Sequence, residues 1–170
     1  MIIRQALATD FAAIWPIFKQ IAAAGDTYAY DRDISAQEAQ HIWMQLPVKT
    51  FVAAEGEPEN GKILGTYYIK TNQAGPGAHV CNCGYMVADT ARGRGLATAM
   101  CEHSQKVAIQ LGYQAMQFNF VASTNVGAIR LWEKLGFEIV GHLPEAFEHP
   151  AEGFVNALVM YKWLADRDSA

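Results

Sequence analysis

The six residues Arg92-Gly93-Arg94-Gly95-Leu96-Ala97 decide how the chain is interpreted, because they join a predicted strand to a predicted helix. The first N–H groups of a helix have no partner within it, and together with the helix dipole they attract an anion. The two glycines let the backbone turn sharply and approach a phosphate, while Arg92 and Arg94 add positive charge. Taken alone, the turn fits an anion site and a solvated surface turn equally well.

This turn does not match the common nucleotide-binding motifs. A P-loop has Lys followed by Ser or Thr where this chain has Leu96 and Ala97. The glycine spacing also differs from G-x-G-x-x-G, which argues against a dinucleotide-binding fold. The surrounding sequence therefore has to identify the ligand.

Outward from the turn, apolar periodicity and turn residues predict an alternation of strands and helices. A turn at 56–61 makes a hairpin of its two neighbouring strands, and an irregular segment with Pro144 and Pro150 separates the last two strands. The pattern predicts an α/β fold with a mixed, mostly antiparallel sheet, helices beside it and a parallel strand pair near the centre. We expect strands at 1–6, 50–55, 62–71, 78–88, 115–121, 137–141 and 154–164, and helices at 10–25, 35–46, 95–111 and 125–135.

Length and composition exclude several classes of protein. The 170 residues are enough for one domain and short for two. No stretch approaches the length of a membrane span, and the N-terminus lacks the features of a signal peptide, so we expect no membrane partner. Three cysteines in no disulfide framework are typical of a reducing compartment, which predicts the cytoplasm. A net charge of −4 argues against a nucleic-acid partner.

Two motifs in this order resemble those of the Gcn5-related N-acetyltransferase (GNAT) superfamily. Residues 92–97 fit its R/Q-x-x-G-x-G/A motif, and residues 125–137, which end in Gly136-Phe137, resemble its second motif. The resemblance extends over essentially the whole chain. It implies a single N-acetyltransferase domain over 1–170, a splayed parallel strand pair at the centre of the sheet, and acetyl-CoA as cosubstrate.

The same resemblance implies how the chain holds the cosubstrate. Backbone N–H groups of the turn would receive the CoA pyrophosphate, and the preceding strand would carry a bulge near residues 85–87 whose backbone pairs with the pantetheine arm. An N–H group there would polarise the thioester carbonyl. The implied CoA-binding residues are Met86, Val87, Arg92, Gly93, Arg94, Gly95, Leu96, Ala97, Thr98 and Asn125.

One departure from the family pattern concerns proton transfer. Many members have Tyr where this chain has Trp132, and that Tyr is proposed to protonate the leaving thiolate. An indole N–H is a hydrogen-bond donor that does not release its proton in this role. We therefore interpret Trp132 as a packing wall beside the cosubstrate.

Two asparagines in predicted central strands, Asn82 and Asn119, are the candidate catalytic residues. An amide inside a strand is disfavoured unless its hydrogen bonds are met, so the pattern alone favours two satisfied structural amides. The segments around Asn82, Asn119 and Asn125 also resemble the azetidine-2-carboxylate (proline-analogue) N-acetyltransferase branch. That closer resemblance implies that Asn82 and Asn119 orient a small substrate through its carboxylate and amine. Tyr28 and Tyr30, in the loop between the first two helices, are predicted to line the same acceptor site.

No other group is a convincing general base. Glu102 and His103 are expected to be solvated on the helix after the turn, whereas Glu145, Glu148 and His149 could line the acceptor pocket. By strand alternation, His79, Cys81 and Cys83 face one side of their predicted strand and Asn82 faces the other. Zinc ligands seldom come from three alternate positions of one strand, so we expect no metal.

The leading hypothesis is transfer of an acetyl group to the amine of a small amino or imino acid, by direct attack on the thioester. The alternatives are a peptide or protein N-acetyltransferase and a non-catalytic acyl-CoA-binding module. A homodimer is an assembly that the family often forms.

Overall fold

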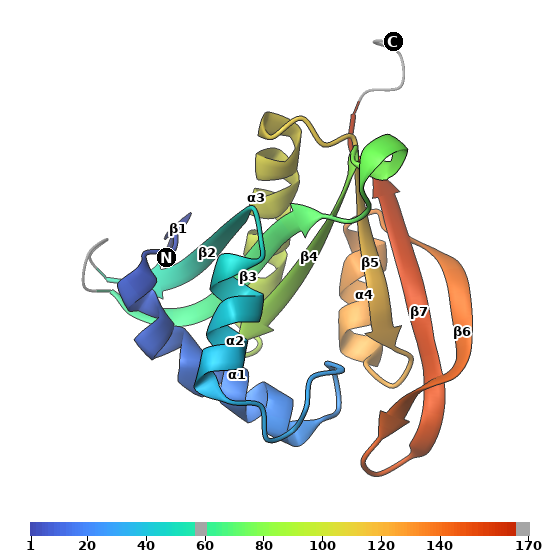
Figure 1. Cartoon of the computed structure of the whole chain (residues 1–170), viewed down its shortest axis with the longest axis horizontal. Helices are drawn as coiled ribbons and strands as arrows, with labels where there is room; N and C mark the ends of the chain where they lie inside the picture. Colours follow the sequence, from blue (N-terminus) through green and yellow to red (C-terminus); the bar gives the residue numbers. More distant parts are fainter. Residues whose placement is uncertain (57–60, 166–170) are drawn as a thin grey trace.

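A seven-stranded sheet with the order β1-β2-β3-β4-β5-β7-β6 forms the centre of the computed structural model, which describes residues 1–56 and 61–165 (Figure 1). The predicted turn at 56–61 falls mostly outside the described residues, but Glu55 pairs with Lys62 as a hairpin requires. The strands are β1 (Ile2–Gln5), β2 (Lys49–Glu55), β3 (Lys62–Thr71), β4 (Val80–Val87), β5 (Ala115–Ala122), β6 (Glu138–His149) and β7 (Gly153–Trp163). The helices are α1 (Phe11–Ala24), α2 (Ala36–Gln40, continued by a π-helical turn, His41–Gln45), α3 (Leu96–Gln110) and α4 (Val126–Lys134).

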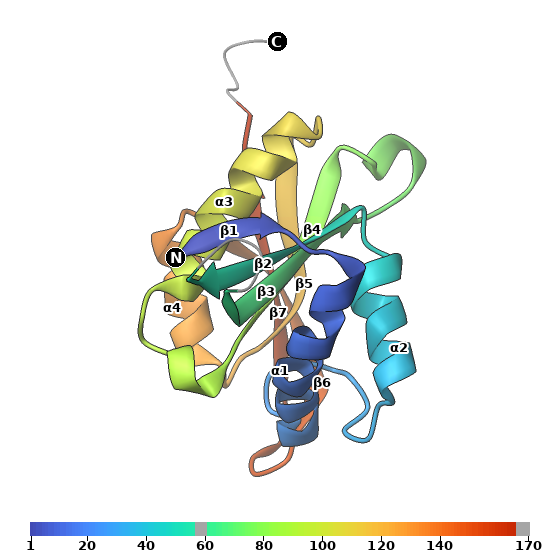
Figure 2. The same cartoon turned by 90° about the vertical axis from the view of Figure 1, so that its left-hand side faces the viewer.

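Helices cover both faces of the sheet, α1 and α2 on one side and α3 and α4 on the other (Figure 2). Side chains alternate along a strand, so β4 contributes to both layers of the core. Cys81 and Cys83 pack in the cluster that includes α3 and α4, and Met86 packs in the cluster that includes α1 and α2. Asn82 lies on the α1 side, because it contacts Tyr68 of that cluster.

The parallel pair β4–β5 is short. It consists of Val80 opposite Ala115, Cys81 opposite Met116 and Asn82 opposite Gln117. Beyond Asn82 the two strands separate toward their carboxyl ends, while β4 stays paired with β3 up to Val87 (Figure 1). The predicted fold class is confirmed: a mixed, mostly antiparallel sheet, flanked by helices and divided at a central parallel pair.

The predicted bulge near residues 85–87 is wrong. Register between β3 and β4 runs without a shift from Thr71–Cys81 to Gly65–Val87. A register shift beside the gap lies instead between β5 and β7, where Asn119 and Phe120 together oppose a single residue of β7. A bulge inserts one residue, breaks the alternation of side chains and is frequent beside active sites. The bulge therefore changes the direction of the β5 side chains at Asn119, which is one of the predicted site residues.

The irregular segment predicted between the last two strands is also wrong. β6 continues through Pro144 to His149 and pairs with β7, with a register shift between Leu143 and Phe147. Proline is tolerated here because β6 is the edge strand of the sheet and the register shift falls around it. Only residues 150–152 form the turn.

None of the helices described over 1–56 and 61–165 has the length and apolar character that crossing a membrane requires.

Gly84 tests the packing of β4 against β3. A Cβ atom on Gly84 would lie 2.6 Å from Cε1 of Tyr68, whose ring is held edge-on by Trp43 at 4.8 Å. We expect Gly84→Ala to lower the free energy of unfolding by about 1–3 kcal/mol, because the methyl group overpacks a closed site. Urea denaturation measures this. Gly127→Ala is the matched control, since a Cβ there meets no atom within 4 Å and the residue is helical; equal effects of the two variants would contradict the packing.

Candidate active site

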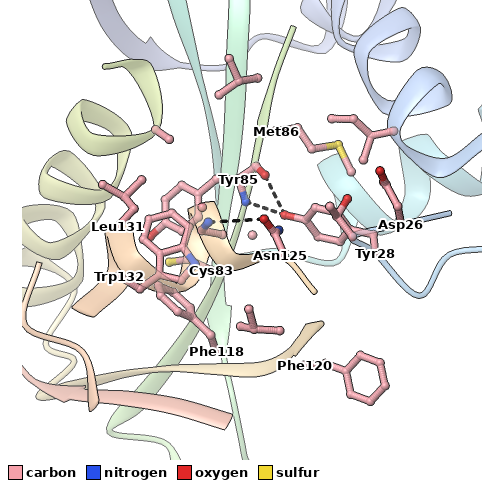
Figure 3. A pocket seen from close by; sticks show the side chains of 18 of the residues that line it. Asp26, Tyr28, Cys83, Tyr85, Met86, Phe118, Phe120, Asn125, Leu131 and Trp132 are labelled. Atoms are coloured by element: carbon pink, nitrogen blue, oxygen red, sulfur yellow. Dashed lines mark hydrogen bonds between the residues drawn. The ribbon is translucent and has the colours of Figure 1, made fainter. Parts of the chain in front are cut away.

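A cavity of about 860 Å³ lies where β4 and β5 separate. Figure 3 shows it from close by, with β4 between the aromatic groups of α4 and β5 on one side and Tyr28 on the other. Its walls come from the α1–α2 loop, β3, β4, β5, the end of β6, α4 and the turn before α3. Segments distant in the sequence therefore meet at the gap in the sheet.

The turn before α3 has the features of an anion site. Gly95, the N-cap of α3, and Gly93 have left-handed backbone with φ of 79° and 74°, which favours glycine. No side chain caps the helix, and a Cβ on either glycine would meet no atom within 4 Å. The N–H groups of residues 96–98 thus lack a cap, and open space lies beside the turn.

The sequence predicts that the two arginines of the turn together add positive charge beside the ligand. In the structure each of them already has a carboxylate partner. Arg94 forms an ion pair with Glu55 at 2.6 Å, and it does not line the cavity. Arg92 lines the cavity and pairs with Asp89 at 2.8 Å; both side chains are exposed. Among the predicted CoA-binding residues, those that line the cavity are Met86, Val87, Arg92, Gly93, Ala97 and Asn125; those that do not are Arg94, Gly95, Leu96 and Thr98.

The free edge of β4 is partly occupied by one side chain. The Tyr28 hydroxyl accepts from the Tyr85 N–H at 2.7 Å and donates to the Tyr85 carbonyl at 2.8 Å (Figure 3). Backbone groups alternate in direction along a strand, so the N–H of Val87 points into the same gap and that of Met86 points toward β3. The backbone of Val87 is therefore available to a ligand, whereas Met86 contributes its side chain.

The start of α4 supplies two further polar groups. Asn125 caps the helix, with its Oδ1 accepting from the Ala128 N–H at 3.4 Å. Thr124 Oγ1 is buried without a hydrogen-bond partner among the described residues, and Thr124 lines the cavity. A buried orphan hydroxyl beside a cavity is a group that a bound ligand would satisfy.

Trp132 forms a wall of the cavity, as predicted. Its ring is buried and packs 5.1 Å from the rings of Tyr85 and Phe118. None of the other α4 residues that line the cavity is acidic, so this helix gives the cavity its shape and supplies no general acid.

Asn82 and Asn119 both line the cavity, but their amides already have partners. Asn82 is buried; its Oδ1 accepts from the Tyr68 hydroxyl and its Nδ2 donates to the Gln117 carbonyl, both at 3.0 Å. Asn119 is exposed on the bulge, accepts from Gln117 Nε2 at 2.9 Å and donates to Asn72 Oδ1 at 2.7 Å. A carboxamide has two N–H donors, so each asparagine keeps one for a ligand.

The predicted acceptor-site tyrosines lie together. Tyr28 and Tyr30 line the cavity, with their rings stacked at 5.4 Å and an interplanar angle of 7°. Burial raises the pKa of Tyr30 to about 12 and the pKa of Tyr28 well above its ordinary range. Both phenols are therefore protonated at neutral pH and act as hydrogen-bond donors.

The candidate bases have separate positions. His149 lines the cavity at the end of β6, whereas Glu145 and Glu148 are exposed and lie outside its lining. Glu102 is exposed as predicted. The prediction for His103 is wrong: it is half-buried, with Nδ1 at 2.7 Å from the Tyr67 hydroxyl, and burial lowers its pKa. The His79, Cys81, Cys83 series forms no metal site, and within 1–56 and 61–165 no group of three such ligands does.

The lining residues that sequence reasoning missed include Asp26, Tyr68 and Lys70. Tyr68 and Lys70 share the face of β3 that looks toward Asn82, and Lys70 is opposite Asn82 in the register. Side-chain alternation would have placed both residues on one face of β3. The pairing with Asn82, however, is a long-range contact that has no local signal.

Comparison with known proteins identifies the class. Residues 10–137 match the model of the acetyltransferase (GNAT) family, and this match spans most of the chain. The chain therefore belongs to the GNAT family, and the predicted enzyme class, N-acetyltransferase, is confirmed.

Individual relatives agree with this assignment. A GCN5-related N-acetyltransferase from Kribbella flavida has the same fold with a TM-score of 0.89 and 41% identity, over 96% of this chain and 97% of that one. The N-acetyltransferase aca1 of Schizosaccharomyces pombe is 29% identical over 148 residues, 79% of this chain and 71% of the relative. A phosphinothricin acetyltransferase from Sinorhizobium meliloti, solved in complex with acetyl-CoA, has a TM-score of 0.83 at 19% identity, covering 96% and 88% of the two chains.

Tyr28→Phe tests the tie between the α1–α2 loop and β4. The variant keeps the stacked ring but removes the hydroxyl that serves both backbone groups of Tyr85. We expect a loss of about 1–3 kcal/mol in the free energy of unfolding, because buried backbone groups lose their partner. Urea denaturation measures it, with Tyr161→Phe on β7 as the control. An unchanged stability of Tyr28→Phe would show that the hydroxyl is dispensable.

Proposed function

We propose that this enzyme transfers the acetyl group of acetyl-CoA to the amine of a small amino or imino acid. The observation that carries the proposal is the composition of the cavity. One end has an uncapped helix N-terminus beside left-handed glycines, and the other has two carboxamides among tyrosines. The first suits a pyrophosphate, and the second suits a small zwitterion.

The residues present fit acetyl-CoA. The N–H groups of residues 96–98 would hold its pyrophosphate, and the free backbone of Val87 would pair with the pantetheine arm. The orphan hydroxyl of Thr124 and the amide nitrogen of Asn125 would supply donors at the opposite wall. The complex of the Sinorhizobium meliloti relative with acetyl-CoA supports this choice of cosubstrate.

Acetyl-CoA supplies an activated thioester, and the protein has to position the amine against it. The neutral amine attacks the carbonyl carbon, so a C–N bond forms and the C–S bond breaks. The Val87 N–H, aimed into the gap, would donate to the carbonyl oxygen as negative charge grows there. The proton of the amine goes to water, and the released thiolate regains a proton from water. Orientation therefore contributes more than a strong acid or base.

At the acceptor end we assign Asn82 and Asn119 to substrate orientation, with Tyr28 and Tyr30 as lining. The remaining N–H of each carboxamide can donate to a carboxylate without adding charge. This assignment follows the resemblance to the azetidine-2-carboxylate branch, and it favours free amino or imino acids over peptides.

The proposal is tested by a screen for thiol release from acetyl-CoA. Amino acids, proline analogues, polyamines and peptides are offered as acceptors. We expect release with one or more free amino or imino acids. Release with peptides alone would support the peptide N-acetyltransferase, and CoA binding without release on any acceptor would support a non-catalytic module.

Asn82→Ala and Asn119→Ala test the acceptor site separately from the CoA site. Each should lower kcat/KM for the acceptor by about 10- to 100-fold, because one orienting hydrogen bond is lost in each variant. The Kd for CoA, measured by calorimetry, should stay within about twofold, since neither side chain lies at the helix N-terminus. Asn119 is exposed, so its variant is expected to fold normally. Near wild-type turnover in both variants would show that the asparagines are structural and do not orient the acceptor.

A further inference from the structure

We propose that Lys70 binds the carboxylate of the acceptor and so restricts the enzyme to free amino or imino acids. This inference rests on the proposed function and names the residue that recognises the substrate class. Lys70 is half-buried near the end of β3 and lines the cavity.

The surroundings of Lys70 place a cation beside the candidate acceptor amide. Lys70 is opposite Asn82 in the β3–β4 register, and its Nζ lies 5.3 Å from the centre of the Tyr68 ring. The Tyr68 hydroxyl in turn donates to Asn82 Oδ1 at 3.0 Å. The ammonium group, the phenol and the amide thus form one polar corner of the cavity.

Among the residues that the structure describes, no carboxylate forms an ion pair with Lys70. The ion pairs among the described residues join Arg4 to Asp10, Arg92 to Asp89 and Arg94 to Glu55. Both arginines of the CoA-binding turn are therefore neutralised by protein carboxylates, but the lysine at the acceptor end is not. A half-buried cation held over an aromatic ring gains from a desolvated anion in the same cavity.

The other charged or titratable residues that line the cavity are less suited than Lys70 to bind the acceptor carboxylate. Asp26, in the α1–α2 loop, has the wrong sign, and Arg92 lies at the CoA end. His149 uses its Nδ1 to accept from the N–H groups of Ala151 and Glu152, both at 3.2 Å. Lys70 is the lining cation opposite Asn82, one of the two amides assigned to the acceptor.

Binding of the acceptor carboxylate by Lys70 would determine which amines are acetylated. A free amino or imino acid has an α-carboxylate one carbon from its amine. The N-terminal residue of a peptide has an amide in that place, and a polyamine has no anion at all. The ammonium group would therefore discriminate by charge, while the asparagines fix the orientation.

The experiment compares each acceptor that releases thiol with its own primary carboxamide, proline with prolinamide for example. The variants are Lys70→Met, Lys70→Arg and the control Lys19→Met. The control also removes a lysine over an aromatic ring (Trp15, 6.0 Å), but Lys19 is exposed on α1 and does not line the cavity. Wild type should prefer the acid. Lys70→Met should raise KM for the acid by about 10- to 100-fold and change KM for the carboxamide by less than about threefold. Lys70→Arg should retain most of the preference, and Lys19→Met all of it.

Calorimetry separates failure of this inference from failure of the proposed function. Binding of the free acids and their carboxamides to the CoA-loaded wild type is measured with the same panel. If the enzyme turns over and Lys70→Met changes KM equally for the acid and the carboxamide, the role of Lys70 is overturned but the proposed acetyl transfer is not. No turnover on any acceptor would overturn the proposed function. In that case the role of Lys70 stands only if a free acid binds and Lys70→Met abolishes that binding; absence of binding overturns it as well.

Discussion

The structure depends on the early loss of pairing between β4 and β5. After three residue pairs, β4 keeps a partner on one edge only, although it lies at the centre of the sheet. A buried backbone N–H or carbonyl without a partner costs about 1–3 kcal/mol, so the gap has to be filled by other groups. The Tyr28 hydroxyl pairs with the backbone N–H and carbonyl of Tyr85. The next residue whose backbone points into the gap, Val87, lines the cavity. The unpaired backbone of this central strand is what supports the proposed binding of an extended ligand arm.

The features around this gap define its two ends. At the closed end, the side-chain amide of Asn82 bridges to the Gln117 carbonyl at the last residue pair before the strands part. The bulge at Asn119 and Phe120 bends β5 away and turns polar groups toward the opening. At the other end, the uncapped N-terminus of α3 faces open space. Asn82 can therefore both stabilise the point where β4 and β5 separate and contact a substrate.

Local patterns predicted much of this arrangement. Glycines before a periodic helix correctly predicted the turn that leads into α3, and alternation correctly placed the cysteines of β4 away from Asn82. The path of β6 was wrong because Pro144 interrupts the pattern of a strand, and an edge strand tolerates that interruption. The bulge was assigned to β4 although it lies in β5, since register is a property of two strands. Lys70 was missed for the same reason: only the β3–β4 register brings it to Asn82.

The central claim is that the gap between β4 and β5, together with the N-terminus of α3, receives acetyl-CoA. Amide hydrogen exchange, measured by NMR with and without CoA, tests it most directly, because the groups assigned to the ligand are backbone N–H groups. We expect amide exchange of Val87, Leu96, Ala97 and Thr98 to slow by at least about tenfold at saturating CoA, and exchange in the β6–β7 hairpin to stay unchanged. Unchanged exchange at these four amides under saturating CoA would contradict it.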